Sequence, residues 1–81
     1  MLLKADIIEF LTNLYFVQDP TCIPLYEQTL AKVTQATASL SKQDEKYKFI
    51  LDLLRDIDTL SLANVPNMEY RFLEACRTLR E

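Results

Sequence analysis

Few side chains in this sequence are equipped for chemistry, because histidine and glycine are both absent from its 81 residues. Without histidine, the chain lacks a proton-transfer group that titrates near neutral pH and an imidazole ligand for zinc. Without glycine, phosphate-binding loops that need positive φ and a close backbone approach are not expected. Carboxylates and two cysteines remain as the candidates for site chemistry.

Asp58 is the carboxylate that breaks the amphipathic pattern, since a helical projection places it near Leu51 and Leu54 in an apolar arc. Burying a lone carboxylate is costly, so we expect Asp58 to accept hydrogen bonds from an arginine, a tyrosine or helix-end amides. A catalytic carboxylate needs a second acid or a nucleophile beside it in a cleft, and no such constellation is recognisable. We therefore expect no enzyme activity, no cofactor and no bound metal. An enzyme with Asp58 as its acid is kept as the last of three alternatives.

Cys22 and Cys76 lie far apart in the sequence and form no CxxC motif. The main interpretation is two buried or half-buried thiols that act as small apolar residues. A disulfide joining the two halves of the chain is the open alternative.

Composition and charge restrict the class of protein. Apolar residues make up 49% and charged residues 26% of the chain, which is typical of a globular fold, here one domain over residues 1–81. The net charge is −3 and no basic stripe exists, so nucleic acid is not an expected partner. No apolar run approaches the ~20 residues of a transmembrane helix, and the start of the chain lacks a signal-peptide layout. A cytoplasmic location is therefore expected.

Two amphipathic patterns fill the first half of the chain. The first helix should span about residues 3–17, with Phe16 alone among its large apolar residues on the polar side. The second should start in the stretch from Asp19 to Pro24, capped by Asp19 or Thr21, and end near Leu40. The apolar stripes are Leu3, Ile7, Phe10, Leu14 and Val17 in the first helix, and Ile23, Tyr26, Leu30, Val33, Thr37 and Leu40 in the second.

Two further patterns fill the second half. Ser41 and Asp44 resemble a capping box, which predicts a third helix from there to about Leu62, with a favourable pair between Asp44 and Lys48. Asn67 should cap a fourth helix over residues 68–80. The third helix has the widest apolar arc, formed by Tyr47, Phe49, Ile50, Leu51, Leu53, Leu54, Ile57 and Leu60; the fourth has the stripe Met68, Phe72, Ala75, Cys76 and Leu79.

The breaks between these segments are short, and short breaks make sequential helices antiparallel neighbours. The predicted fold is an all-α, antiparallel four-helix bundle in up-down-up-down order. We expect a monomer or a weak dimer.

Tyr70, Leu73 and Arg77 share the face of the fourth helix opposite its core stripe. Tyrosine and arginine are typical interface anchors, so this strip is a candidate contact site. The alternative is that Tyr70 and Leu73 fold back onto the preceding loop or are scattered surface apolar residues. The same two interpretations apply to Phe16.

The layout resembles that of the small immunity proteins that protect Gram-positive bacteria from their own class IIa bacteriocins, particularly the enterocin A type. The segments that carry the resemblance are residues 7–15 (IIEFLTNLY) with Asp19-Pro20, residues 24–30 (PLYEQTL), and the junction 60–67 leading into residues 70–73 (YRFL). The resemblance implies a cytosolic antiparallel four-helix bundle that binds the cytoplasmic side of a bacteriocin-engaged sugar-transporter receptor. It also implies that specificity lies toward the C-terminal half, which here corresponds to Asn64, Val65, Pro66, Asn67, Tyr70, Leu73 and Arg77.

A non-enzymatic bacteriocin immunity protein acting by protein–protein contact, at the inner face of the membrane, is thus the leading hypothesis. The alternative is a helical adaptor or chaperone-like subunit of a larger assembly. It is motivated by the wide apolar arc of the third helix, because surplus apolar surface rarely stays in contact with water.

Overall fold

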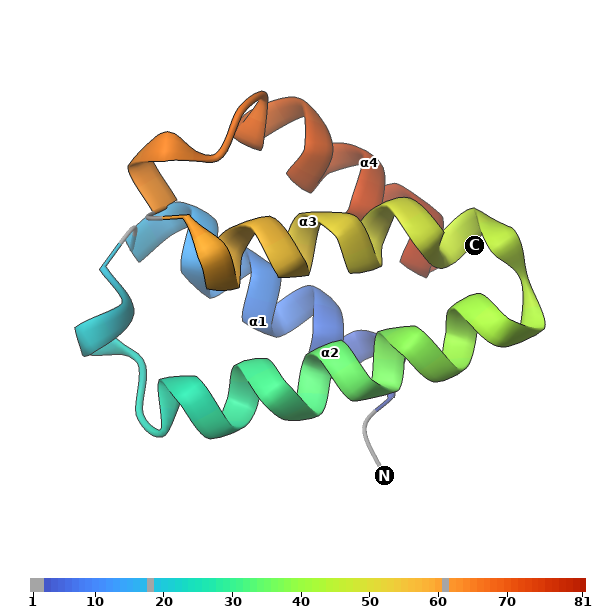
Figure 1. Ribbon diagram of the computed structural model, residues 1–81, viewed down its shortest axis with the longest axis horizontal. Coiled ribbons are helices and arrows are strands. Elements are labelled where there is room, and N and C mark those ends of the chain that lie inside the picture. Colours follow the sequence, from blue (N-terminus) through green and yellow to red (C-terminus); the bar gives the residue numbers. More distant parts are fainter. Residues whose placement is uncertain (1–2, 18, 61) are drawn as a thin grey trace.

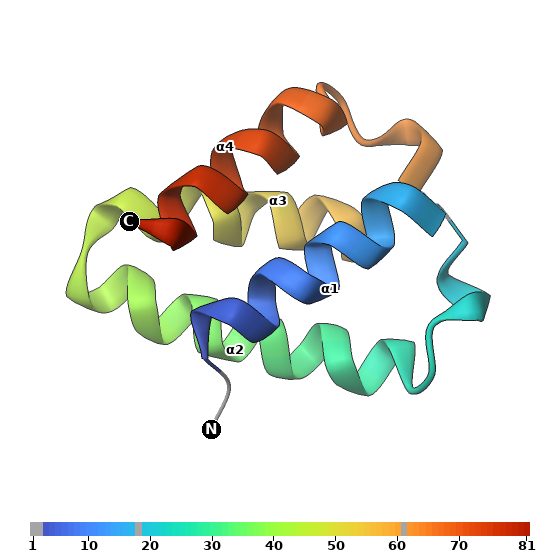
Figure 2. The same cartoon turned by 180° about the vertical axis from the view of Figure 1, so that it is seen from behind.

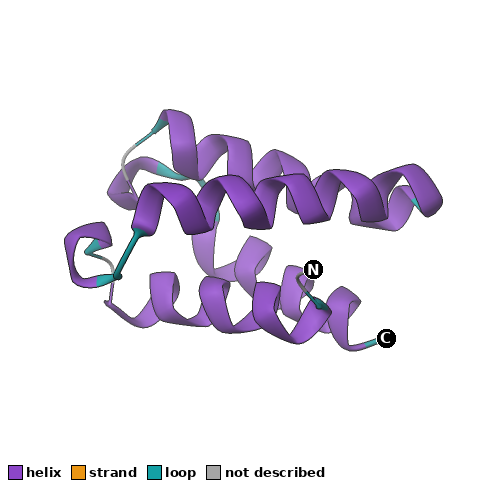
Figure 3. Ribbon diagram, turned by 90° about the horizontal axis from the view of Figure 1, so that it is seen from below, coloured by secondary structure: helices purple, strands orange, loops and turns teal. Residues whose placement is uncertain are grey.

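The computed structural model describes residues 3–17, 19–60 and 62–81 of the chain. The four predicted helices are present as α1 (Lys4–Val17), α2 (Tyr26–Gln43), α3 (Lys48–Thr59) and α4 (Met68–Arg80). Single 3₁₀ turns lie in the three connections, at Pro20–Cys22, Glu45–Tyr47 and Leu62–Asn64. Helices and loops account for all of the described residues, without a strand (Figure 3).

The helices run in up-down-up-down order, so the α1–α2 and α3–α4 connections lie at one end of the bundle (Figures 1 and 2). The α2–α3 connection and the C-terminus lie at the other end. The most extensive packing is between α1 and α4 and between α2 and α3; α1 also packs on α2, and α3 on α4. The predicted antiparallel four-helix bundle is confirmed. None of the described helices combines the length and apolarity needed to cross a bilayer.

A single core fills the bundle and draws on all four predicted stripes. In α2, Leu30, Val33 and Thr37 are buried, and Thr37 satisfies its hydroxyl by donating to the Val33 carbonyl at 2.8 Å. The α4 stripe is buried from Phe72 to Leu79, while Met68 packs at its edge. In the stripes of the first, second and fourth helices, the described residues that stay exposed are Leu3, directly before α1, and Val17 at its end.

The apolar arc of α3 is largely covered within one chain. Six of its eight residues are buried, and Phe49 and Leu60 are the two that remain exposed. The surplus apolar surface that motivated the assembly alternative is therefore small.

The connections differ from the sequence-based expectations. Ser41 does not start α3, because α2 continues to Gln43 and the Ser41 hydroxyl donates to the Ala38 carbonyl. Asp44 instead caps the 3₁₀ turn that follows, accepting from the Lys46 amide at 3.0 Å. Asp44 also pairs with Lys46 rather than with Lys48. The third helix ends at Thr59 rather than near Leu62. Ser61, within the expected extension, lies outside the described residues.

The start of α2 and the start of α4 use the same backbone device. Each follows a proline and a residue with positive φ: Leu25 (φ 53°) before α2 and Asn67 (φ 55°) before α4. Neither residue caps its helix through its side chain, which corrects the prediction for Asn67. Asp19 caps the 3₁₀ turn at Pro20, and neither Asp19 nor Thr21 caps α2.

Candidate partner-binding surface

The outer face of α4 exposes the predicted strip. Tyr70 and Leu73 keep 59% and 55% of their surface accessible, and they line a shallow hollow of about 600 Å³ with Asn67, Met68, Glu69 and Glu74. Arg77 is exposed one turn further along, with a guanidinium nitrogen 3.8 Å from a Glu74 carboxylate oxygen. Tyr70 and Leu73 therefore do not fold back onto the preceding loop, and the strip is available for contact.

The connection before α4 supplies three of its four predicted residues to the surface. Asn64, Pro66 and Asn67 are exposed, but Val65 retains only 6% of its surface and belongs to the core. Val65 directly follows the 3₁₀ turn; its amide donates to the Leu62 carbonyl at 3.4 Å and its side chain packs in the core. Val65 therefore anchors the connection in the core, and its contact role stays a prediction.

Arg71 holds this connection in place. Its guanidinium lies 2.8 Å from the Asp56 carboxylate of α3 and donates to the Pro66 carbonyl at 3.4 Å. The Arg71 side chain is largely covered, so this pair is less screened by water than the other ion pairs of the chain. One side chain therefore ties the start of α4 both to α3 and to the loop that presents the candidate residues.

Phe16 is also on the surface, with 74% of its area accessible, as its place on the polar side of α1 predicted. Its ring meets the Tyr15 ring edge-to-face at 5.3 Å, and Tyr15 stacks on Phe72 of α4 at 4.5 Å. The exposed Phe16 thus rests on an aromatic platform shared by α1 and α4. A local sequence pattern cannot reveal this platform, because its members are far apart in the chain.

Asp58 is exposed, which contradicts its predicted burial. It lies at the edge of a groove of about 710 Å³ between α2 and α3, with Tyr26 and Glu27. Burial, followed by the negative charges of Asp58 and Glu27, raises the pKa of the Tyr26 phenol. The two carboxylates therefore act on one phenol from two different helices.

The cysteines offer no activated nucleophile. Cys22 is exposed and Cys76 is buried, and both thiols are free, so burial is confirmed for Cys76 only and the disulfide does not form in this structure. A hydrogen bond with Asp19 raises the pKa of the Cys22 thiol, and burial raises that of Cys76. Within the described ranges, acidic and cysteine side chains form no group of three placed to hold a metal ion.

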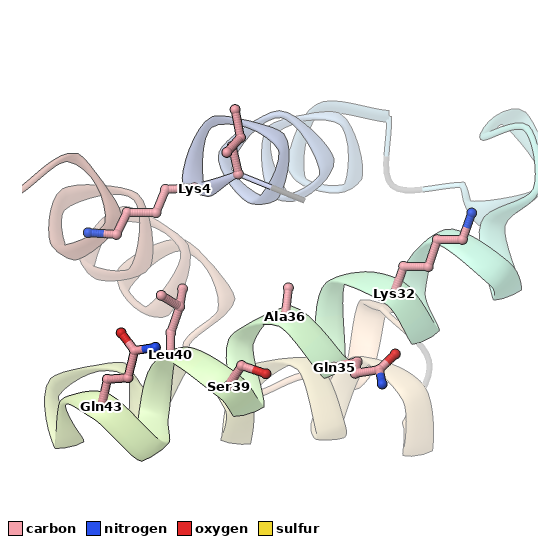
Figure 4. A pocket seen from close by; sticks show the side chains of 8 residues that line it. Lys4, Lys32, Gln35, Ala36, Ser39, Leu40 and Gln43 are labelled. Atoms are coloured by element: carbon pink, nitrogen blue, oxygen red, sulfur yellow. The ribbon is translucent and has the colours of Figure 1, made fainter. Parts of the chain in front are cut away.

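A second groove, of about 630 Å³, lies between the start of α1 and the outer side of α2 (Figure 4). Ala36 and Leu40 lie along its floor, while Lys4 and Lys32 lie toward its two ends. No local pattern indicates this groove, because its two walls are more than twenty residues apart in the chain. Its charged lining residues are both lysines, whereas the Tyr26 groove is lined by Glu27, Asp58 and Arg55.

No protein-family model, curated protein or solved structure matches this chain. The resemblance to bacteriocin immunity proteins therefore rests on the sequence segments alone, and the candidate surface rests on its own geometry.

Proposed function

We propose that this chain is a non-enzymatic immunity protein of the class IIa bacteriocin type, which acts by protein–protein contact at the cytoplasmic side of a membrane receptor. The observation that carries the proposal is the exposed strip of Tyr70, Leu73 and Arg77 on α4. Tyrosine and arginine exposed on one helix face are suited to anchor a protein contact. The bundle fold is also the one that the resemblance implies.

The strip lies on a helix that is held firmly in place, which favours a contact site over the alternative of scattered surface apolar residues. The ion pair of Arg71 with Asp56 and the Tyr15–Phe72 stack hold the start of α4 against both of its neighbours. A contact surface that is already ordered loses less conformational entropy on binding.

Expression of the chain in a bacteriocin-sensitive strain tests the proposal. We expect survival against at least one peptide of a class IIa panel, and we expect the double variant Tyr70→Ala, Leu73→Ala to remove that protection. The matched control is Phe49→Ala, which removes an exposed aromatic ring at the other end of the bundle. Unchanged killing across the panel, or full protection by the double variant, would contradict the proposal.

The alternative, a subunit of a larger helical assembly, keeps Phe49 and Leu60 as its unpaired apolar residues. Sedimentation separates the two functions. A compact monomer is expected for the immunity protein, whereas a stable dimer that buries Phe49 and Leu60 would favour the assembly.

A further inference from the structure

The two ends of the bundle carry opposite charge. We define the acidic end as the α1–α2 and α3–α4 connections with one flanking helical turn on each side, which is residues 14–29 and 56–71. Its described charged side chains are five carboxylates and one guanidinium, a net charge of −4: Asp19, Glu27, Asp56, Asp58, Glu69 and Arg71. The opposite end, residues 3–7, 40–51 and 77–81, has six basic and four acidic side chains, a net charge of +2.

The carboxylates of the acidic end are mostly unpaired. Asp56 is engaged by Arg71, but Asp19, Glu27, Asp58 and Glu69 are exposed and form no ion pair with any described lysine or arginine. Asp19 is held ionised, since hydrogen bonds from the Thr21 hydroxyl and amide lower its pKa. Four carboxylates of this end therefore face solvent without an ion pair, and Arg55 is the basic side chain that shares the groove of Glu27 and Asp58.

The same end exposes most of the large apolar side chains of the chain. Five of the eight that the structure leaves exposed lie there, namely Phe16, Val17, Leu25, Leu60 and Tyr70. Leu25 is 68% accessible, and it directly precedes Tyr26 and Glu27, which line the groove shared with Asp58. The charged side chains that line this groove are Glu27, Asp58 and Arg55, so exposed apolar and acidic residues lie close together at its start.

Two residues at this end are unfavourable for folding. Leu25 has φ 53°, a left-handed conformation that glycine or asparagine adopts at lower cost, and the equivalent residue of the second turn is Asn67. Asp58 lies in the last turn of α3, where the helix dipole disfavours a negative charge, and that turn has no basic residue. Local conflicts of this kind concentrate where a surface serves binding rather than stability.

We propose that the acidic end is a docking surface for a basic amphipathic polypeptide segment. The apolar face of that segment packs on Leu25, Tyr26 and Leu60, and its lysine or arginine side chains pair with Glu27 and Asp58. The proposal goes beyond the contact function proposed above. It concerns a second surface of the bundle, distinct from the strip of Tyr70, Leu73 and Arg77, and it names the chemistry of the segment that binds there. Charge complementarity selects this occupant: a carboxylate-rich surface repels acidic segments and anionic lipid headgroups.

Fluorescence anisotropy tests the proposal with the full chain and a labelled peptide of about 18 residues, in which leucines form one helical face and lysines the other. We expect saturable binding that weakens as salt is raised. A scrambled peptide of the same composition should bind at least about tenfold more weakly, because it presents no apolar face. Equal binding of the two peptides would overturn the proposal.

Two variants locate the binding site. The double variant Glu27→Gln, Asp58→Asn should weaken binding about tenfold or more. Its matched control is Glu45→Gln, Asp52→Asn, which removes two negative charges by the same substitutions at exposed positions outside the acidic end. This control should leave the affinity within about twofold of the parent. Equal losses in the two variants would show a net-charge effect and overturn the assignment of the site.

Leu25→Asn separates docking from a structural role, because asparagine suits the left-handed backbone and should keep the fold. We expect this variant to be at least as stable as the parent and to bind the peptide several-fold more weakly; unchanged binding would contradict the role of Leu25.

The chain itself could also occupy this surface. If the parent forms head-to-tail oligomers and the variant Glu27→Gln, Asp58→Asn does not, the occupant is a second copy of the chain, and the proposal is overturned. Protection of cells without peptide binding would overturn this inference alone, and binding without protection would overturn the proposed function alone.

Discussion

The two ends of this bundle satisfy their charges in different ways. At the end that contains the α2–α3 connection, Lys46 lies 3.9 Å from Asp44 and 4.0 Å from Glu81. The ammonium groups of Lys4 and Lys46 also lie 5.2 and 5.3 Å from the centre of the buried Tyr47 ring. At the acidic end, Arg71 with Asp56 is the one ion pair among the described residues, and the other carboxylates face water.

The difference indicates which end of the bundle satisfies its charged and apolar side chains without a partner. One end draws together the start of α1, the end of α4 and a connection through ion pairs and cation–ring contacts. The other end leaves like charges and apolar side chains exposed, with a leucine in a backbone conformation that suits asparagine. An end that is unfavourable in isolation is the end where a partner gains most by binding.

Removing the ring under the acidic end should have the largest effect on stability. Phe72→Ala deletes a buried side chain and the stack on Tyr15, so we expect a loss of about 3–4 kcal/mol in the free energy of unfolding. Phe16→Ala, which removes the exposed ring of the same cluster, should cost less than about 1 kcal/mol. Urea denaturation measures both. Equal losses would show that Phe16 is a core residue rather than a surface one.

The second-largest difference in stability should come from the ion pairs of the two ends. Arg71→Met should cost about 1 kcal/mol, since it leaves Asp56 without its partner and the Pro66 carbonyl without its donor. Lys46→Met should cost less than about 0.5 kcal/mol, because its pairs are longer and more exposed. Thermal unfolding at low and high salt measures both losses. A larger loss for Lys46→Met would reverse the comparison of the two ends.

Exchanging the residues of the two proline turns should shift stability in opposite directions. Leu25→Asn should stabilise the chain by roughly 0.5–1 kcal/mol, because asparagine tolerates positive φ better than leucine. Asn67→Leu should destabilise it by a similar amount, for the same reason. The measurement is the midpoint of urea unfolding. Destabilisation by both changes would mean that the Leu25 side chain contributes packing that outweighs its strained backbone.

The smallest effect should appear at alkaline pH. The pKa of Tyr26 is raised in the folded chain, so its contribution to stability is complete below the ordinary tyrosine pKa of about 10 and is lost as the pH rises through the folded value. Tyr26→Phe should therefore flatten the alkaline decrease in unfolding free energy. Asp58→Asn should lower the pKa of Tyr26, and the absorbance of the phenolate during an alkaline titration measures that pKa. An unchanged pKa would show that the Asp58 charge does not act on Tyr26.

Periodicity predicted the helices of this chain well but not their ends. The stripes of α2 and α4 pack on the core as expected, because the 3.6-residue repeat alone decides which face is apolar. Ser41 and Asp44 fit a capping box, yet no helix-breaking residue precedes Asp44, so α2 continues through Ser41. The choice between one helix and two depended on hydrogen bonds that a local motif does not encode.

Asp58 shows why the candidate site was only partly predictable. Its helical angle places it beside Leu51 and Leu54, but both the buried leucines lie one turn or more before it, and Asp58 faces the open groove beside Tyr26. A helical projection gives the angle of a side chain around the helix axis. It does not show whether a neighbouring helix extends far enough to cover that side chain. Tyr70, Leu73 and Arg77 were predictable because exposure opposite a core stripe follows from angle alone. Val65 was not, since its burial depends on how the 3₁₀ turn folds.

Amide chemical-shift mapping of the uniformly ¹⁵N-labelled chain, titrated with the leucine–lysine peptide, tests the central claim most directly. The account predicts that the largest shifts fall within residues 14–29 and 56–71, with residues 40–51 and 77–81 almost unchanged. Shifts concentrated at residues 40–51 and 77–81, or spread evenly over the bundle, would contradict it.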